Sequence, residues 1–138
     1  MRELRHLYVS VDGVDVFYRE AGPPERPTLL LLHGFPSSAI QFRYMLAELS
    51  DRWHLVAPDL PGFGFTRLSN DARYSFTFDA LAATIGGFIR KLSLDVSAAY
   101  LHDYGGHVAF AFSRTRQFVH KLSSFRTRRH IAALGGTT

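Results

Sequence analysis

The chain has 138 residues, of which 46% are hydrophobic and 20% are charged. This length and composition are typical of one modest globular domain with a core of its own. Because cysteine is absent, disulfides, thiolate metal sites and cysteine nucleophiles are excluded. No signal peptide is visible, and the apolar run Leu29–Leu32 is too short to span a bilayer. We therefore expect a cytoplasmic location.

The net charge of +4 is unevenly distributed along the chain. Residues 1–112 carry 10 Lys and Arg against 12 Asp and Glu, whereas residues 113–138 carry 6 basic residues and no acidic ones. We expect two regions with a boundary at this point: a folded core at residues 1–112 and a basic tail at residues 113–138. The tail is hypothesised to be either out of frame, with the frame lost near Phe112 to Arg114, or disordered.

The first predicted elements are two strands and a buried third strand. Leu7–Val11 and Val14–Tyr18 alternate with period 2 around Asp12-Gly13, a preferred hairpin turn. After a loop rich in glycine and proline, the segment Thr28–His33 is apolar almost throughout. Such a run is typical of a strand that is covered on both faces of a parallel sheet.

Helices and strands then alternate. Ser38 with Gln41 predicts a capping box at the start of a helix, and Trp53–Ala57 predicts the next strand. A second helix is expected from about Phe78 to Leu92, where the pair Gly86-Gly87 would weaken it by about 1 kcal/mol per glycine. Ala98–His102 predicts a further short strand, followed by an apolar continuation at Val108–Phe112. This order predicts the α/β class, with helices flanking a parallel sheet.

Three glycine-containing turns follow the three predicted parallel strands: His33-Gly34-Phe35-Pro36, the segment 58–64, and His102-Asp103-Tyr104-Gly105-Gly106. The carboxyl ends of parallel strands form one crevice, where ligands bind in open α/β sheets. Taken alone, Asp103 would be a helix N-cap, a common role for aspartate between a strand and a helix. With the other two turns correctly placed, a position in the shared crevice is favoured over the N-cap interpretation.

Residues from about Leu7 to Phe112 resemble the N-terminal part of the α/β-hydrolase fold, a hairpin plus parallel strands with flanking helices, truncated after the nucleophile elbow. The resemblance is to the branch that contains epoxide hydrolases and haloalkane or haloacetate dehalogenases. It implies that Asp103 is the catalytic nucleophile, which forms an alkyl-enzyme ester that water later hydrolyses. It also implies that the backbone N–H groups of Phe35 and Tyr104 form the oxyanion hole. The tight packing of such an elbow would account for Gly105 and Gly106.

Three residues depart from the pattern of the branch. Phe35 stands where haloalkane dehalogenases usually have a halide-binding asparagine, and Tyr104 stands where they usually have a tryptophan. Both departures favour epoxide-hydrolase-like chemistry, with haloalkane or haloacetate dehalogenation as the alternative. Leu101 replaces a small residue that many hydrolases have two places before the nucleophile, and we expect it to crowd the elbow.

Several other polar residues are interpreted as structural. His33 and Asp59 are expected to support their turns, and His107 is expected to point away from the crevice. No cofactor and no metal is implied, and His120 and His130 show no ligand spacing. The expected partner of the complete family member is a small-molecule substrate, with no membrane; the oligomeric state stays open.

The catalytic machinery of the family needs an acid and a histidine beyond the nucleophile. The 35 residues after Asp103 contain no Asp or Glu. We therefore expect a chain that is incomplete, poorly soluble and without turnover alone. The competing hypothesis is a non-enzymatic protein whose basic tail binds nucleic acid. That tail lacks a recognised motif, and nucleic acid is the less favoured partner.

Overall fold

The computed structural model describes residues 3–71 and 73–114. Their elements, in chain order, are β1 (Arg5–Val11), β2 (Val14–Ala21), β3 (Thr28–Leu32), the short 3-10 helix η1 (Ala39–Phe42), α1 (Arg43–Leu49), β4 (His54–Pro58), β5 (Arg67–Leu68), α2 (Phe78–Lys91), β6 (Val96–Leu101) and α3 (Tyr104–Ser113). None of the helices in these ranges is long and apolar enough to cross a membrane.

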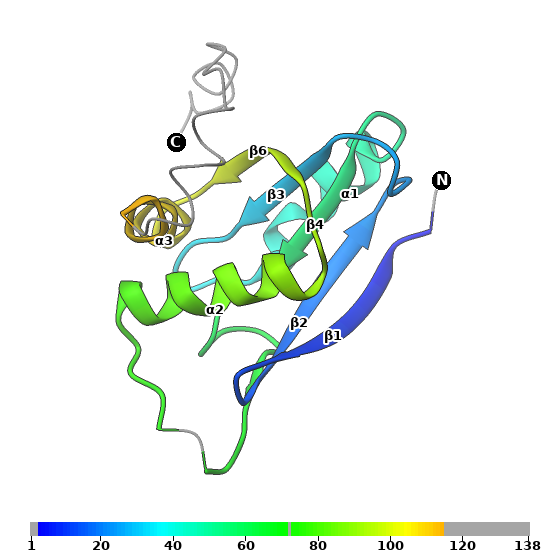
Figure 1. Cartoon of the computed structure of the whole chain (residues 1–138). Helices are drawn as coiled ribbons and strands as arrows, with labels where there is room; N and C mark the ends of the chain where they lie inside the picture. The colour runs from blue at the N-terminus through cyan, green and yellow to red at the C-terminus, as the bar shows by residue number, and fades with distance from the viewer. Residues whose placement is uncertain (1–2, 72, 115–138) are drawn as a thin grey trace.

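The strands form one mixed sheet in the order β1-β2-β4-β3-β6, with β5 paired to β2 (Figure 1). β3 runs parallel to both β4 and β6, as the sequence predicts. β2 runs antiparallel to β1 and also to β4. The β1–β2 hairpin is therefore joined to the parallel strands β4, β3 and β6 through an antiparallel pair. All residues of β3 and β4 are buried, which fits the aliphatic runs Leu29–Leu32 and Leu55–Ala57 within them.

Helices cover both faces of the sheet (Figure 1). One core cluster joins α2 and α3 to the sheet and includes Val16, Phe88 and Val108. A second cluster on the other face joins η1 and α1 to β3 and β4 through Phe42 and Leu46. This two-faced packing confirms the predicted α/β architecture.

The glycine pair in α2 permits close packing. The helix is continuous from Phe78 to Lys91. A Cβ at Gly86 would lie 2.6 Å from the Phe112 ring, and a Cβ at Gly87 would lie 2.5 Å from Cγ1 of Val11. The lower helix propensity of glycine is thus offset by direct contact of α2 with α3 and β1.

The predicted capping box at the first helix is wrong. Ser38 does cap the helix, since its Oγ accepts a hydrogen bond from the N–H of Ile40 at 3.3 Å. Gln41 does not reach back to Ser38; its Oε1 accepts from the N–H of Gly34 at 3.2 Å. The side-chain amide of Gln41 therefore provides a hydrogen-bond acceptor for a backbone N–H in the turn after β3.

β6 forms one edge of the sheet within the described residues, because it pairs only with β3 there. Its side chains are half-buried or exposed, in contrast to those of β3 and β4. Leu101 at its end is 41% exposed and Phe110 of α3 is 67% exposed. The predicted basic tail lies outside the described residues apart from Ser113 and Arg114.

Candidate active site

The three turns predicted to share one crevice do meet. They follow β3, β4 and β6, whose carboxyl ends lie at one end of the sheet. The N–H of Leu60 donates to Nε2 of His33 at 2.9 Å, which joins the turns after β4 and β3. The N–H of Phe35 donates to Oδ2 of Asp103 at 3.0 Å, which joins the turns after β3 and β6. Each turn is thus fixed to another by a hydrogen bond.

Asp103 has a strained backbone, with φ 51° and ψ −111°. A positive φ is rare for residues other than glycine, and holding one in such a region costs of order 1–3 kcal/mol. Asp103 precedes α3, yet its side chain makes no capping hydrogen bond to that helix. Asp103 therefore occupies the N-cap position without capping the helix through its side chain, and the sharp turn directs the exposed carboxylate across to the turn after β3.

The surroundings of Asp103 keep its carboxylate ionised. The hydrogen bond from the Phe35 N–H is the largest influence and lowers the pKa below its usual 3.8. Partial desolvation opposes it, while the Tyr104 N–H and the nearby His102 and His107 lower the pKa further. Hydrogen bonds to a carboxylate favour its charged form. Asp103 is therefore an anion at neutral pH, the form that a nucleophile needs.

Glycine is required where the turns approach each other. A Cβ at Gly34 would lie 2.6 Å from the Cβ of Asp103, and a Cβ at Gly105 would lie 2.3 Å from the carbonyl oxygen of Leu32. Either contact is shorter than real Cβ atoms tolerate. Gly106 was expected to be needed for the same reason, but a Cβ there would have no heavy atom within 4 Å. The tight approach is made by Gly105 alone.

Asp59 is structural, as predicted. It is fully buried, and its two carboxylate oxygens accept from different turns. Oδ1 accepts from the N–H of Ala39 at 2.7 Å and Oδ2 accepts from the N–H of Phe65 at 2.9 Å. One carboxylate therefore ties the turn after β4 to the start of η1.

His33 is also structural. It is fully buried; Nδ1 lies 3.0 Å from the carbonyl oxygen of Gly34, and Nε2 accepts from Leu60. These partners require a neutral ring with the hydrogen on Nδ1, because a carbonyl only accepts and a backbone N–H only donates. Burial lowers the pKa of the His33 imidazole, more than the Gly34 carbonyl and Asp59 raise it. The neutral ring is the form that the fold uses.

Replacing His33 with glutamine is expected to change the pH dependence of stability. The folded-state pKa of His33 lies below the ordinary 6.5, so the unfolded chain binds more protons between the two values. Its contribution is then complete above the unfolded pKa and is lost as pH falls toward the folded pKa, by at most about 1.4 kcal/mol per pH unit. Urea unfolding at a series of pH values should show a flatter slope for His33→Gln below neutral pH. An unchanged slope would contradict the assignment.

Aromatic rings from the three turns pack on one another. Phe35 and Tyr104 have ring centroids 5.4 Å apart, and Phe63 lies 6.0 Å from each of them. Phe78, the first residue of α2, packs on Tyr104 at 5.1 Å. Phe63 and Phe78 were not predicted as site residues, because a place in a turn or at a helix start does not indicate which other side chains a ring will contact.

Two further residues near the elbow, His107 and Leu101, can be compared with their expected positions. His107, which was expected to point away from the crevice, stacks on Phe78 with ring centroids 4.9 Å apart and makes no hydrogen bond to Asp103 among the described residues. Leu101 was expected to crowd the elbow, but its side chain is partly exposed at the sheet edge. It does not obstruct the turn. No three His, Asp or Glu side chains within residues 3–71 and 73–114 are placed to hold a metal ion.

Comparisons with known proteins place this geometry in a family. The sequence matches the α/β hydrolase fold over residues 27–125. An uncharacterized hydrolase from Saccharomyces cerevisiae is 50% identical over 105 residues, which are 76% of this chain and 36% of the yeast protein. The crystal structure of an epoxide hydrolase from Vigna radiata has 33% identity and a TM-score of 0.71, covering 83% of this chain and 35% of that one. A haloalkane dehalogenase from Bradyrhizobium elkani has 28% identity and a TM-score of 0.69, with 80% and 37% covered.

The chain therefore belongs to the α/β-hydrolase family. Within that family it corresponds to the N-terminal part of the branch that contains epoxide hydrolases and haloalkane dehalogenases. It spans about 36% of the length of the yeast relative.

Proposed function

We propose that this chain supplies the nucleophile and the oxyanion hole of an epoxide-hydrolase-like enzyme. The observation that carries the proposal is the strained turn at Asp103, whose ionised carboxylate is exposed and held by the N–H of Phe35 at 3.0 Å. The carboxylate of Asp59, which supports the fold, is buried with both oxygens paired, whereas that of Asp103 is exposed. Asp103 has an oxygen left for chemistry.

The two carboxylate oxygens of Asp103 have separate roles in this proposal. The other oxygen attacks a carbon of the epoxide ring, the ring C–O bond breaks, and the released alkoxide takes up a proton from solvent water. The product is an ester between Asp103 and the substrate. Oδ2 remains as the ester carbonyl oxygen beside the N–H of Phe35. When water attacks the ester carbon, negative charge develops on this oxygen, and the Phe35 and Tyr104 N–H groups stabilise it.

The side chains at the site favour an epoxide over a haloalkane. A leaving halide is stabilised by hydrogen-bond donors, and the phenyl ring of Phe35 has none to offer. This ring is 59% exposed and packs on Tyr104, so it forms an apolar wall beside the carboxylate. Hydrophobic walls with a few placed polar groups are usual for small-molecule sites.

The hydrolytic half of the reaction needs further groups. An acid and a histidine that activate water do not follow Asp103 in this sequence as a pair, since no Asp or Glu occurs after residue 103. Among the described residues, no histidine hydrogen-bonds Asp103. We therefore propose that the chain alone forms the ester without releasing product.

Covalent labelling tests the proposal directly. The full chain is incubated with a small terminal epoxide, and intact-protein mass spectrometry is expected to show one adduct of the epoxide's mass, which peptide mapping places on Asp103. The matching terminal bromoalkane is expected to label far more slowly. No diol should be released by the chain alone, because the ester is not hydrolysed. Labelling spread over several exposed carboxylates would contradict the nucleophile assignment, and continuing diol release would contradict the incompleteness.

A further inference from the structure

The backbone donor that holds Asp103 belongs to a turn with supports of its own. The Phe35 N–H, which donates to Oδ2 of Asp103, is part of the peptide group that joins Gly34 to Phe35. Because a peptide group is planar, the direction of this N–H is tied to that of the Gly34 carbonyl in the same plane. The carbonyl oxygen lies 3.0 Å from Nδ1 of His33 and accepts from the N–H of Ser37 at 2.9 Å. The donor is therefore held from its carbonyl side.

Gln41 holds the preceding peptide group of the same turn. Its Oε1 accepts from the Gly34 N–H at 3.2 Å, and that N–H has no other acceptor within residues 3–71 and 73–114. Gln41 lies in η1, where Ala39 and Phe42 are buried, so the backbone of this short helix is anchored in the core. The side chain of Gln41 therefore reaches from an anchored element to the turn after β3.

Glycine at position 34 makes this support necessary. A Cβ there would lie 2.6 Å from the Cβ of Asp103, so the close approach of the two turns excludes a larger residue. Glycine also has the widest choice of backbone angles, and rotation about its two bonds would swing the Phe35 N–H away from the carboxylate. Hydrogen bonds restrict both rotations: Gln41 holds the peptide group before Gly34, and the two bonds to the Gly34 carbonyl hold the one after it.

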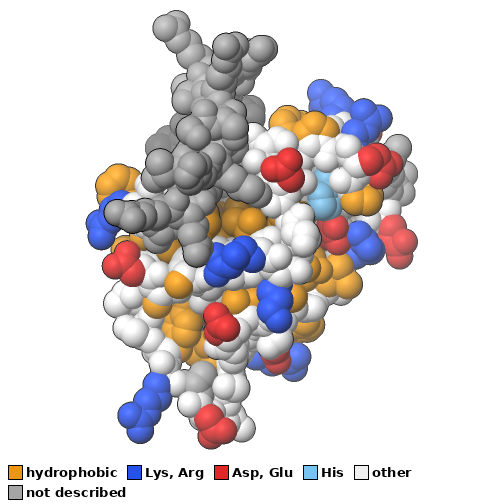
Figure 2. Space-filling model, in the orientation of Figure 1, with side chains coloured by type: hydrophobic (Ala, Val, Ile, Leu, Met, Phe, Trp, Pro, Cys, Tyr) orange, Lys and Arg blue, Asp and Glu red, His pale blue; other side chains and the backbone are white. Residues whose placement is uncertain are grey.

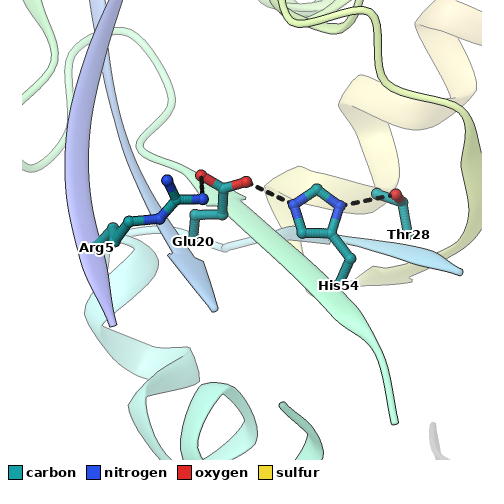
Figure 3. A network of polar contacts seen from close by, with 4 residues as sticks. All are labelled: Arg5, Glu20, Thr28 and His54. Atoms are coloured by element: carbon teal, nitrogen blue, oxygen red, sulfur yellow. Dashed lines mark hydrogen bonds and ion pairs between the residues drawn. The ribbon is translucent and has the colours of Figure 1, made fainter. Parts of the chain in front are cut away.

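The polar side chains at the opposite end of the sheet form a different kind of network (Figure 3). Both carboxylate oxygens of Glu20 are paired there, one with Arg5 at 2.8 Å and the other with Nε2 of His54 at 2.6 Å. Nδ1 of His54 lies 3.0 Å from Oγ1 of Thr28, so the network links four strands and its carboxylate is paired on both sides. The hydrogen bonds that begin at Gln41 lead instead to an exposed carboxylate.

We propose that Gln41 is a positioning residue for the reaction proposed above: its side-chain oxygen fixes the direction in which the Phe35 N–H points at the Asp103 carboxylate. The consequence for catalysis rests on the proposed function, whereas the hydrogen bonds exist without substrate. Gln41 then acts on two steps. It helps to orient the carboxylate for attack on the epoxide carbon, and it keeps the same N–H in place when charge develops on the ester carbonyl oxygen.

An NMR pH titration of the full chain carrying Gln41→Met tests this role. Methionine has a side chain of similar length without the oxygen acceptor. The Phe35 N–H lowers the pKa of Asp103 below its ordinary 3.8, so a loosened turn should move the midpoint of the Asp103 carboxyl carbon up toward that value. The response of the Phe35 amide proton to the same titration should shrink. Epoxide labelling should slow about 3- to 10-fold, because the carboxylate is less firmly oriented.

Two further variants separate positioning from simple support of the helix. Ser38→Ala removes the cap of η1, in which Oγ accepts from the Ile40 N–H at 3.3 Å, and leaves the acceptor of Gln41 in place, so the Asp103 midpoint should not move. Gln41→Glu keeps an acceptor oxygen at the same reach, so the response at Phe35 should be retained. If Gln41→Met does not fold, Gln41→Ala, which adds no atom at this half-buried site, takes its place.

The role of Gln41 and the proposed function fail in different ways. An unchanged Asp103 midpoint with an unchanged Phe35 response in Gln41→Met would overturn the role of Gln41, whatever the chain does with epoxide. An equal shift of the midpoint in Ser38→Ala would also overturn it. A midpoint that rises in a chain that epoxides never label would support the role of Gln41 and contradict the nucleophile assignment.

Discussion

Asp103→Asn is expected to abolish covalent labelling by an epoxide. The amide is nearly the same size as the carboxylate, and its oxygen can still accept from the N–H of Phe35, so the turn is retained. The amide has no negative charge and is a poor nucleophile, so ester formation stops. Intact-protein mass spectrometry under the conditions that label the parent chain measures the effect. Asp51→Asn, at a side chain that is 72% exposed, is the control and should label normally.

The pH dependence of labelling gives a second test of the same site. The Phe35 N–H lowers the pKa of Asp103 below its ordinary 3.8, so the carboxylate stays ionised at every pH above that value. The labelling rate should be flat from about pH 8 to about pH 5 and should decline only below the ordinary aspartate value. A midpoint above that value would show that the backbone donors do not act on the nucleophile in solution.

The buried strands and long helix were predictable from local sequence. The four consecutive leucines within residues 28–33 have few alternatives to a strand covered on both faces, and the structure places β3 at Thr28–Leu32. The helix expected from Phe78 to Leu92 ends one residue earlier, at Lys91. The pairing of strands that are distant in sequence was harder to predict, because hydrophobic periodicity does not specify which strands lie side by side. The antiparallel contact of β2 with β4 was therefore not predicted.

The candidate site shows the same division. Turn chemistry and spacing placed Asp103 between a strand and a helix, and the resemblance assigned its role. The bond between its carboxylate and the Phe35 N–H depends on two backbone angles that no residue type encodes alone. The role of Gln41 was misinterpreted because its side-chain oxygen could accept a hydrogen bond either from the backbone N–H of Ser38 at the helix start or from the N–H of Gly34. Sequence spacing favoured the first, and the folded turn provides the second.

Charge distribution was only partly informative. The face of the molecule in Figure 2 has acidic and basic side chains interspersed over the described residues rather than gathered into one basic surface. A basic surface is the usual electrostatic signature of nucleic-acid binding. The binding hypothesis for residues 113–138 stays a prediction. Its measurement is salt-sensitive binding to duplex DNA that disappears when those residues are deleted.

The two neighbouring glycines after Asp103 are expected to respond oppositely to alanine. In Gly105→Ala the new Cβ would lie 2.3 Å from the Leu32 carbonyl oxygen, a backbone atom of a fully buried strand that cannot move aside. We expect the free energy of unfolding to fall by about 3 kcal/mol. In Gly106→Ala the Cβ enters open space on the same helix, so the better helix propensity of alanine should raise stability by up to about 1 kcal/mol.

Urea unfolding of both variants beside the parent chain measures this difference. Since the two substitutions add the same methyl group one residue apart, propensity alone would stabilise both. Opposite signs would show that the elbow packs α3 against β3 through Gly105. A stable Gly105→Ala chain would mean that the turn relaxes in solution. Asp103 would then lose the fixed approach to the Phe35 N–H on which its proposed role depends.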